Sequence, residues 1–242
     1  MALLDENFEV TCNPHNRVLS REELLEGVAG KGGILSLLTD TMDGEVMDQA
    51  GRGLRMIANY AVGFNNIDVD AATKRKIAVS NTPGVLTDTT ADSAVALILT
   101  VARRIVEGDG YARAGKYRGW DPLLLLGSDV HHKSLGILGF GRVGQALAKR
   151  ARGFDMRIIY HSRHRAEPEI EQGLDAVFAD LETLLRTCDF LSIHVPLTPQ
   201  TKGLIDAGRL SLMKPTAFVI NTARGEVIRE EALVEALTEK RI

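Results

Sequence analysis

The chain has 242 residues, 45% hydrophobic and 25% charged, with a formal net charge of -3, which is typical of a folded globular protein with one large or two modest domains. This composition argues against disorder, and the scattered basic residues give no positive field that would favour nucleic acid, so small molecules are the expected ligands. No apolar run approaches the roughly 20 residues of a membrane span, and the first residues lack the pattern of a secretory signal, so we expect a cytoplasmic protein that binds no membrane.

The first 88 residues alternate short apolar runs with polar helical stretches. Runs at residues 33–38, 54–60 and 77–80 are candidate strands of a small α/β unit. Residues 3–10 are typical of a helix that leads into a strand, with no earlier strand to open the sheet. We therefore expect the chain to begin inside its first domain.

Residues 88–107 carry apolar side chains at helical spacing without an interrupting proline, which predicts one long helix of the kind that can bridge two domains. The following segment, residues 108–132, contains Trp120 and the run 123–126, and it is too apolar for a solvated loop. Two interpretations stay open for this segment. It can form a contact between copies of the chain, or it can be buried against its own domain.

From residue 135 onwards strands and helices alternate regularly. Candidate strands lie at 135–139, 156–161, 175–179, 189–194 and 216–221, and candidate helices at 142–153, 180–187, 206–213 and 229–240. This alternation predicts a parallel sheet with helices on both faces. A complete dinucleotide-binding fold has six strands, and the sequence supplies five before it ends in the helix that would lead to the sixth. We therefore expect a chain truncated at both ends.

The stretch from Leu135 to Gly144, LGILGFGRVG, carries the strongest functional signal. An apolar strand runs directly into Gly139, Gly141 and Gly144, and a helix follows. At this spacing the glycines allow a tight turn, a close approach of backbone to a pyrophosphate, and close packing of helix on strand. The helix amides would then face the anion, so the motif predicts a nicotinamide dinucleotide site.

The end of the second strand of this region bears on the choice between NAD and NADP. An acidic residue about 20 positions beyond the glycines normally binds the ribose 2′-hydroxyl of NAD. Here that position holds Ser162, followed by Arg163 and, nearby, Arg165. A hydroxyl and guanidinium groups suit a 2′-phosphate, so NADP(H) is favoured, with NAD(H) possible. The alternative is that both arginines are solvated surface residues.

Arg224 follows the fifth strand, in the crevice where doubly wound folds bind ligands. Its fork of donors suits a substrate carboxylate together with a polarised carbonyl, whereas a helix-capping role or an ion pair with Glu226 is the structural alternative. His194 ends the fourth strand, but no carboxylate partner is evident, so we do not assign it as a proton donor. Cys12 and Cys188 have no metal-ligand spacing, which predicts two reduced thiols and no metal site.

Four stretches together resemble the D-isomer-specific 2-hydroxyacid dehydrogenases, and within that family the glyoxylate and hydroxypyruvate reductase branch. They are Ala58–Asp92, Leu135–Arg163, His194–Asp206 and Leu212–Ile228, in the family's order. The resemblance implies a flavodoxin-like substrate domain, whose N-terminal part is residues 1–88, and an inserted NAD(P)-binding Rossmann domain, residues 89–242, which lacks its last strand. It also implies a homodimer that includes residues 108–132.

The resemblance further implies roles for individual residues. Val62 and Gly63 would form the backbone loop that receives the substrate carboxylate, and Arg224 would be the catalytic arginine that also binds substrate. The implied cofactor-binding residues are Gly139, Phe140, Gly141, Arg142, Val143 and Gly144 in the turn, Ser162, Arg163 and His164 in the 2′-phosphate pocket, and Pro196, Thr201, Thr222 and Ala223 elsewhere.

The family mechanism would transfer hydride from the nicotinamide to the keto carbon while a histidine, oriented by a glutamate, protonates the oxygen. The family's glutamate and histidine lie beyond Ile242, and none of the six histidines matches, so we expect a partial sequence of a normal enzyme. Its reaction would be NADPH-preferring reduction of glyoxylate or hydroxypyruvate. The alternatives are a phosphoglycerate, formate or phosphite dehydrogenase, or a nucleotide-sensing protein like the corepressors that resemble this family.

Overall fold

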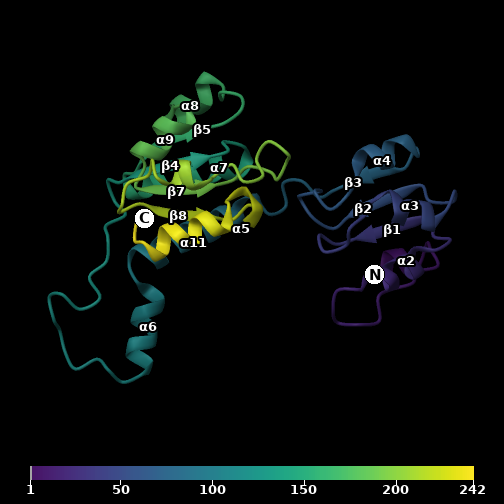
Figure 1. Cartoon of the computed structure of the whole chain (residues 1–242), viewed down its shortest axis with the longest axis horizontal. Coiled ribbons are helices and arrows are strands. Elements are labelled where there is room, and N and C mark those ends of the chain that lie inside the picture. Colours follow the sequence, from purple (N-terminus) through teal and green to yellow (C-terminus); the bar gives the residue numbers. More distant parts are fainter. Residues whose placement is uncertain (1) are drawn as a thin grey trace. The chain divides into compact units, whose positions relative to one another are not determined.

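The computed structural model describes residues 2–242 (Figure 1). The chain divides into two units, Met1–Val85 and Leu86–Ile242. Each unit has its own sheet and its own hydrophobic core. The sequence-based boundary between residues 88 and 89 falls at the start of the second unit. The assignment of the units to a substrate domain and a nucleotide domain stays a prediction.

The first unit is a three-stranded parallel sheet with order β1-β2-β3. Its elements are α1 (Ala2–Asp5), α2 (Arg21–Val28), β1 (Gly33–Ser36), α3 (Gly44–Ala50), β2 (Met56–Asn59), α4 (Val69–Lys74) and β3 (Ala78–Ser80). Val46, Met47 and Ile57 are fully buried and anchor the core of this unit. The expected strand at the end of residues 3–10 is wrong, because α1 is followed by irregular chain up to α2.

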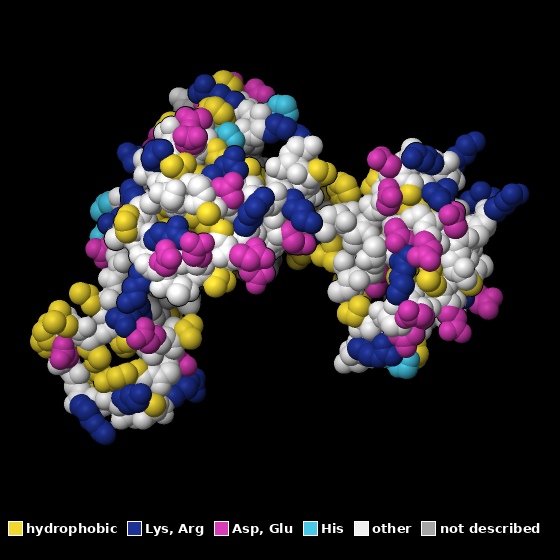
Figure 2. Space-filling model, in the orientation of Figure 1, with side chains coloured by type: hydrophobic (Ala, Val, Ile, Leu, Met, Phe, Trp, Pro, Cys, Tyr) yellow, Lys and Arg dark blue, Asp and Glu magenta, His cyan; other side chains and the backbone are white. Residues whose placement is uncertain are grey.

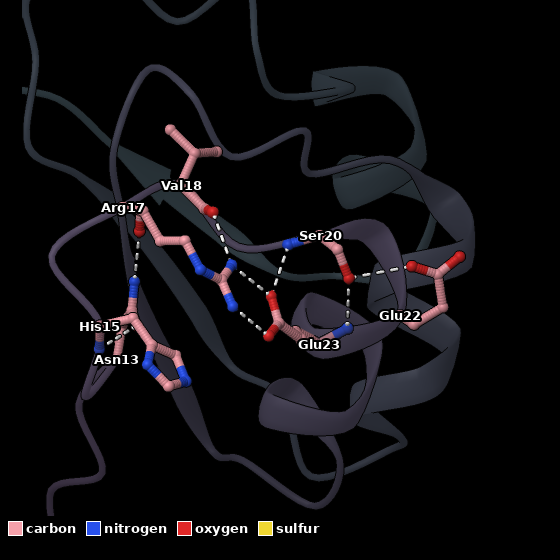
Figure 3. A network of polar contacts seen from close by, with 7 residues as sticks. All are labelled: Asn13, His15, Arg17, Val18, Ser20, Glu22 and Glu23. Carbon is pink, nitrogen blue, oxygen red and sulfur yellow. Dashed lines mark hydrogen bonds and ion pairs between the residues drawn. The ribbon is translucent and has the colours of Figure 1, made fainter.

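The start of α2 is fixed by a capping box (Figure 3). The Glu23 amide donates to Ser20 Oγ at 3.3 Å, and the Ser20 amide donates to the Glu23 carboxylate at 2.8 Å. Arg17 donates two hydrogen bonds, of 2.6 and 2.7 Å, to the same carboxylate. Hydrogen bonds from Arg17 and from the Ser20 backbone lower the pKa of Glu23 to about 2. The segment before α2 is therefore tied to the helix although it has no regular structure.

The long helix expected over residues 88–107 is wrong, because the structure has two helices, α5 (Thr87–Ala102) and α6 (Ile105–Arg113). Arg104 between them takes a left-handed conformation with φ of 54°. The Ala102 carbonyl, which would accept from residue 106 in a continuous helix, instead accepts from Ser128 N at 2.8 Å. The chain returning at residue 128 therefore ends α5, and Figure 1 shows α6 and the loop after it extending away from the sheet.

The second unit contains five parallel strands in the order β6-β5-β4-β7-β8, which confirms the predicted doubly wound sheet. The elements after α6 are β4 (Ser134–Leu138), α7 (Arg142–Ala151), β5 (Arg157–His161), α8 (Pro168–Leu174), β6 (Ala176–Phe178), α9 (Leu181–Thr187), β7 (Phe190–Ile193), α10 (Ala207–Leu210), β8 (Phe218–Asn221) and α11 (Glu230–Thr238). Short 3-10 turns lie at Arg152–Phe154 and Gly225–Val227. Strand β4 is central and buried along its whole length, and β8 is an edge strand.

Two apolar layers cover the faces of this sheet. One layer joins α5 and α7 to residues such as Leu135, Ile137 and Phe190, and the other joins α9, α10 and α11 to residues such as Leu191 and Ile193. Between β4 and α9 the fit is close, because a Cβ on Gly136 would lie 2.7 Å from the Cβ of Cys188. Burial raises the pKa of the Cys188 thiol to about 12, so this cysteine acts as a small apolar side chain.

A polar clamp joins the starts of β4 and β7 at the edge opposite the strand ends. The Asp189 carboxylate accepts from Ser134 N at 2.8 Å and from Ser134 Oγ at 2.7 Å, and it pairs with Lys214 Nζ at 2.7 Å. Burial opposes ionisation of Asp189, but the hydrogen bonds from Lys214 and Ser134 outweigh it and lower its pKa to about 2. No helix of residues 2–242 is long and apolar enough to cross a bilayer, and the same residues contain no group of three potential metal ligands.

Candidate functional site

The residues expected to bind a nucleotide follow four neighbouring strands of the second unit. Strands β5, β4, β7 and β8 are parallel and adjacent, so their carboxyl ends meet at one edge of the sheet. The glycine turn follows β4, Ser162 follows β5, Pro196 follows β7 and Thr222 follows β8. A ligand at this edge would lie at the position where doubly wound folds bind theirs.

The turn after β4 requires glycine at two of its three glycine positions. Gly139 has a φ of 97°, and a Cβ there would lie 2.7 Å from the carbonyl carbon of His194. A Cβ on Gly144 would lie 2.3 Å from the Gly139 carbonyl oxygen. At Gly141, by contrast, an added Cβ would meet no atom within 4 Å. Sterics within the protein therefore explain Gly139 and Gly144, and the space beside Gly141 is open to a ligand.

Helix α7 begins directly at this open space. Gly141 is its N-cap residue, no side chain caps its amides, and its first turn contains no acidic residue. The first amides of a helix have no partner within the helix, and together with the helix dipole they attract an anion. Arg142 is exposed at the first helical position, and Val143 is half-buried. These residues fit the pyrophosphate of a dinucleotide, which the three-glycine spacing also predicts.

Phe140 contributes to the turn through its backbone. Its ring is 4% exposed and stacks on Tyr160 with a centroid distance of 4.0 Å. The Phe140 carbonyl accepts from Gln145 Nε2 at 3.0 Å, which fixes the turn to α7. The Phe140 side chain thus packs in the core beneath the turn, and the Phe140 backbone is the part that can face a nucleotide.

The loop after β5 holds the residues expected around a 2′-phosphate. Ser162 is half-buried, and Arg163 and His164 are exposed. Within residues 2–242 Arg163 makes no hydrogen bond or ion pair, whereas Arg165 makes two hydrogen bonds to Glu171. The two arginines are therefore in different states, a distinction that sequence reasoning missed.

The loop after β7 is held by the hydroxyl group of Thr201. Thr201 Oγ1 donates to the Pro196 carbonyl at 2.6 Å, and Thr198 N donates to Thr201 Oγ1 at 2.8 Å. Since the Thr201 hydroxyl is engaged within the loop, its effect on a nucleotide would be to hold Pro196 in place. Pro196 itself is exposed at the carboxyl edge.

His194 lies between β7 and the loop after β8. Its Nε2 is 2.8 Å from Ser192 Oγ, and its Nδ1 is 3.4 Å from Thr222 Oγ1. Burial lowers the pKa of His194 to about 4, so the ring is neutral near pH 7. With hydroxyl partners and no net charge, this histidine orients Thr222 and is poorly suited to donate a proton to substrate.

Asn221, the last residue of β8, shapes the loop that carries Arg224. Its Oδ1 accepts from Ala223 N at 3.0 Å, and its Nδ2 donates to the Arg224 carbonyl at 2.8 Å. The Arg224 guanidinium donates from Nη1 to the Ala223 carbonyl at 2.9 Å. Arg224 is half-buried and extended, so a fixed loop presents its guanidinium at the carboxyl edge.

In the first unit, a network of asparagines holds the loop that contains Val62 and Gly63. Asn59, 2% exposed at the end of β2, accepts from Ser36 Oγ at 2.9 Å and donates to the Gly63 carbonyl at 2.8 Å. Asn81 Nδ2 donates to the Val62 carbonyl at 2.7 Å. With both carbonyls engaged, the amides of Val62 and Gly63 donate to no other residue that the structure describes. Two adjacent amides of this kind can receive a carboxylate.

Sequence reasoning missed Asn59, Asn221 and His194 as residues that shape these loops. A signal for two of them is present, because Asn59 and Asn221 each end an apolar strand directly before a glycine-containing loop. Asparagine amides at such positions satisfy backbone groups of the turn. Ser192 lies two residues before His194 at strand spacing, whereas Thr222 comes from the loop after β8, so no local pattern reveals this second partner.

A family model and a curated relative that match this chain point to the same family. Residues 95–242 match the family model "D-isomer specific 2-hydroxyacid dehydrogenase, NAD binding domain". A glyoxylate reductase of Thermococcus gammatolerans is 50% identical over 241 residues, which cover 98% of this chain and 72% of that protein.

Two solved structures are similar over nearly the whole chain. A protein of Thermus thermophilus superposes with a TM-score of 0.89 at 47% identity, covering 98% of this chain and 74% of that one. A glyoxylate reductase from Paecilomyes thermophila gives a TM-score of 0.88 at 33% identity, covering 100% and 74%. The chain thus spans roughly three quarters of the length of each of these three proteins.

Proposed function

Because the chain belongs to the D-isomer-specific 2-hydroxyacid dehydrogenase family, we propose that it reduces glyoxylate or hydroxypyruvate to the corresponding 2-hydroxy acid and uses NADPH in preference to NADH. Membership makes it a nicotinamide-dependent oxidoreductase. The proposed reaction is supported by the open space beside Gly141, which lies at the same edge of the sheet as Arg224. The substrate class follows the glyoxylate reductase of Thermococcus gammatolerans, which is 50% identical to this chain over 241 aligned residues.

The residues of the turn fit a nicotinamide dinucleotide. The open space beside Gly141 would leave room for the pyrophosphate, and the free amides at the start of α7 would bind it. Pro196, Thr222 and Ala223 would line the path of the cofactor towards the β8 edge. When bound, the cofactor supplies the hydride that reduces the keto carbon.

Arg224 is proposed as the residue that acts on the substrate. Its guanidinium carries a fixed positive charge, and its donors can hold the substrate carboxylate and the keto oxygen together. As hydride adds to the keto carbon, negative charge develops on that oxygen, and a pre-oriented guanidinium stabilises it. The hydrogen bonds of Asn221 to the same loop support this role, because they fix the backbone of Arg224 beforehand.

Val62 and Gly63 are proposed to receive the substrate carboxylate through their amides. Their carbonyls are held by Asn81 and Asn59, which orients the peptide planes and leaves the N–H groups available. The preference for NADPH rests on the loop after β5. It has no carboxylate at Ser162 to repel a 2′-phosphate, and it has an exposed guanidinium at Arg163.

A homodimer is proposed through α6 and the segment after it. Figure 2 shows hydrophobic side chains gathered on this part of the second unit. Trp120 is 83% exposed, and the other exposed apolar side chains of the patch are Ile105, Val106, Tyr117, Leu123 and Leu126. A contiguous apolar surface of this kind is typical of a protein contact. Burial of these side chains against their own unit, the other interpretation of the sequence, does not occur in the described chain.

The function is tested by the rates at which the full-length protein oxidises NADPH and NADH with glyoxylate at equal concentrations. We expect faster oxidation of NADPH, and substrates without a carboxylate should react poorly with either cofactor. A clear preference for NADH would contradict the cofactor assignment. Nucleotide binding without reduction of any 2-keto acid would contradict the activity and favour a nucleotide-sensing protein.

A further inference from the structure

Arg165 is held in an ion pair at the edge of the proposed 2′-phosphate pocket. Its Nε donates to Glu171 Oε1 at 2.9 Å and its Nη2 donates to Glu171 Oε2 at 2.8 Å. This is the side-by-side geometry in which a guanidinium binds a carboxylate or a phosphate. One of the two donor edges with which Arg165 could bind a phosphate is therefore already occupied.

The Glu171 carboxylate is firmly fixed. Its side chain is 12% exposed, and it also accepts a hydrogen bond of 2.5 Å from the buried Tyr160 hydroxyl. That hydroxyl in turn accepts from Ala166 N at 2.8 Å, which ties the loop to β5. Hydrogen bonds from Arg165 and Tyr160 lower the pKa of Glu171, so it is ionised at neutral pH. The Arg165 guanidinium also lies 5.9 Å from the centre of the Phe178 ring, which adds a cation–π contact.

Arg163 offers a contrast two residues earlier in the same loop. It is exposed and, within residues 2–242, has no carboxylate partner. The loop thus contains one guanidinium that is ready to bind an anion and one that is neutralised by a fixed carboxylate. A phosphate that bound Arg165 through this edge would have to displace Glu171, and one that bound through the other edge would be repelled by the negative charge of Glu171.

We infer that Glu171 is a specificity-determining residue, which limits the affinity of the site for a 2′-phosphate by holding Arg165 in an ion pair and leaving Arg163 to bind that group. This inference rests on the proposed function, in which the loop after β5 receives the 2′ end of the cofactor. It predicts that the preference for NADP is moderate and that one substitution outside the glycine turn can strengthen it.

The test uses adenosine 2′,5′-bisphosphate and 5′-AMP, which differ only in the 2′-phosphate, in calorimetric titrations of the full-length protein. Glu171→Gln keeps the size of the side chain and a hydrogen-bond partner for Tyr160 but removes the charge. We expect it to increase affinity for the bisphosphate about fivefold relative to 5′-AMP, as for a gained surface ion pair. Glu167→Gln makes the same charge change at an exposed position of this segment and should leave the ratio unchanged.

Arg165→Ala tests whether a gain in affinity for the bisphosphate comes from the release of Arg165 or from the change of charge alone. In the unsubstituted protein it should change the ratio less than twofold, and in the Glu171→Gln background it should abolish the gain. The inference is overturned if Glu171→Gln leaves the ratio unchanged or weakens both ligands equally. It is also overturned if Arg165→Ala alone lowers the ratio fivefold, a result that does not require Glu171→Gln to fold. Failure of the proposed function looks different, because the unsubstituted protein would then bind neither ligand or would prefer 5′-AMP.

Discussion

Gly139 and the His194 carbonyl are in such close contact that no side chain can be placed between them. A Cβ on Gly139 would lie 2.7 Å from the His194 carbonyl carbon and 2.8 Å from its oxygen. The contact brings the end of β4 against the end of β7, where His194 N donates to the Leu138 carbonyl at 2.7 Å. The turn of the candidate nucleotide site is therefore built on the junction of the two central strands.

Gly139→Ala should destabilise the fold. The substitution adds a Cβ at a φ of 97° and forces the ends of β4 and β7 apart. Left-handed strain and overpacking together should lower the free energy of unfolding by about 2 to 4 kcal/mol. Urea unfolding monitored by circular dichroism measures this, with Gly153→Ala, where a Cβ meets no atom within 4 Å, as the control. An unchanged unfolding midpoint for Gly139→Ala would show that the junction can relax.

Arg224→Ala should abolish reduction while nucleotide affinity stays within about threefold, because the side chain is proposed to act on substrate charge. Steady-state kinetics with glyoxylate and titration with NADPH separate the two effects. Arg229→Ala, an exposed arginine five residues later, serves as the control and should keep its activity. If the Arg224 variant loses cofactor binding to the same extent as activity, Arg224 has a structural role instead.

Asp189→Asn should weaken the clamp between β4 and β7. The pKa of Asp189 is about 2 in the folded protein, below its unfolded value, so its contribution is complete above about pH 4 and is lost as the pH falls towards 2. The shift corresponds to about 2 kcal/mol, and Asn should remove it and reduce the acid sensitivity in that range. Asp175→Asn, at an exposed position, is the control for unfolding measured between pH 5 and 2. Equal acid profiles for the two variants would contradict the clamp.

His194→Gln should remove a different pH dependence. Burial lowers the folded pKa of His194 to about 4, so the unfolded chain binds an extra proton between about pH 6.5 and 4, and stability falls as the pH is lowered through that range. The expected loss is about 3 kcal/mol for the histidine protein and less for the variant. Unfolding free energies at pH 7 and pH 4 measure the difference. The same pH dependence in both proteins would show that His194 is solvated.

Trp120→Ser should shift the protein towards the monomer, because the side chain is 83% exposed and belongs to the proposed contact. Analytical ultracentrifugation over a concentration series measures the change in dissociation constant, which should be at least about tenfold. Val234→Ser removes an exposed apolar side chain from α11 and should leave the equilibrium unchanged. A monomeric unsubstituted protein would refute the dimer.

Much of the second unit could be predicted from sequence because its signals are local. The strand, the glycine spacing and the helix of Leu135–Gly144 are contiguous, and contacts within the protein explain Gly139 and Gly144. The break between α5 and α6 could not be predicted, because it depends on Ser128 taking the Ala102 carbonyl from a distance of 26 residues. Helical periodicity reports which face is apolar and does not report such a competitor.

The sequence also could not predict which of the two arginines in the loop after β5 forms an ion pair. The sequence assigned Arg163 to the 2′-phosphate pocket and noted Arg165 nearby, but only the structure shows that Glu171 engages Arg165. Tyr160 contributes from within β5, where its hydroxyl joins two residues that follow it in the chain. Polar networks of this kind are set by tertiary packing, so residue type and spacing cannot identify them.

Binding of a nicotinamide dinucleotide at the glycine turn can be tested by titrating NADPH into the Gly141→Ala protein. An added Cβ would meet no protein atom within 4 Å, so the variant should unfold at the same urea concentration as the unsubstituted protein. Its affinity for NADPH should nevertheless fall at least about tenfold, because the methyl group would occupy space proposed for the pyrophosphate. Unchanged affinity for NADPH in a folded variant would contradict binding of the dinucleotide at this turn.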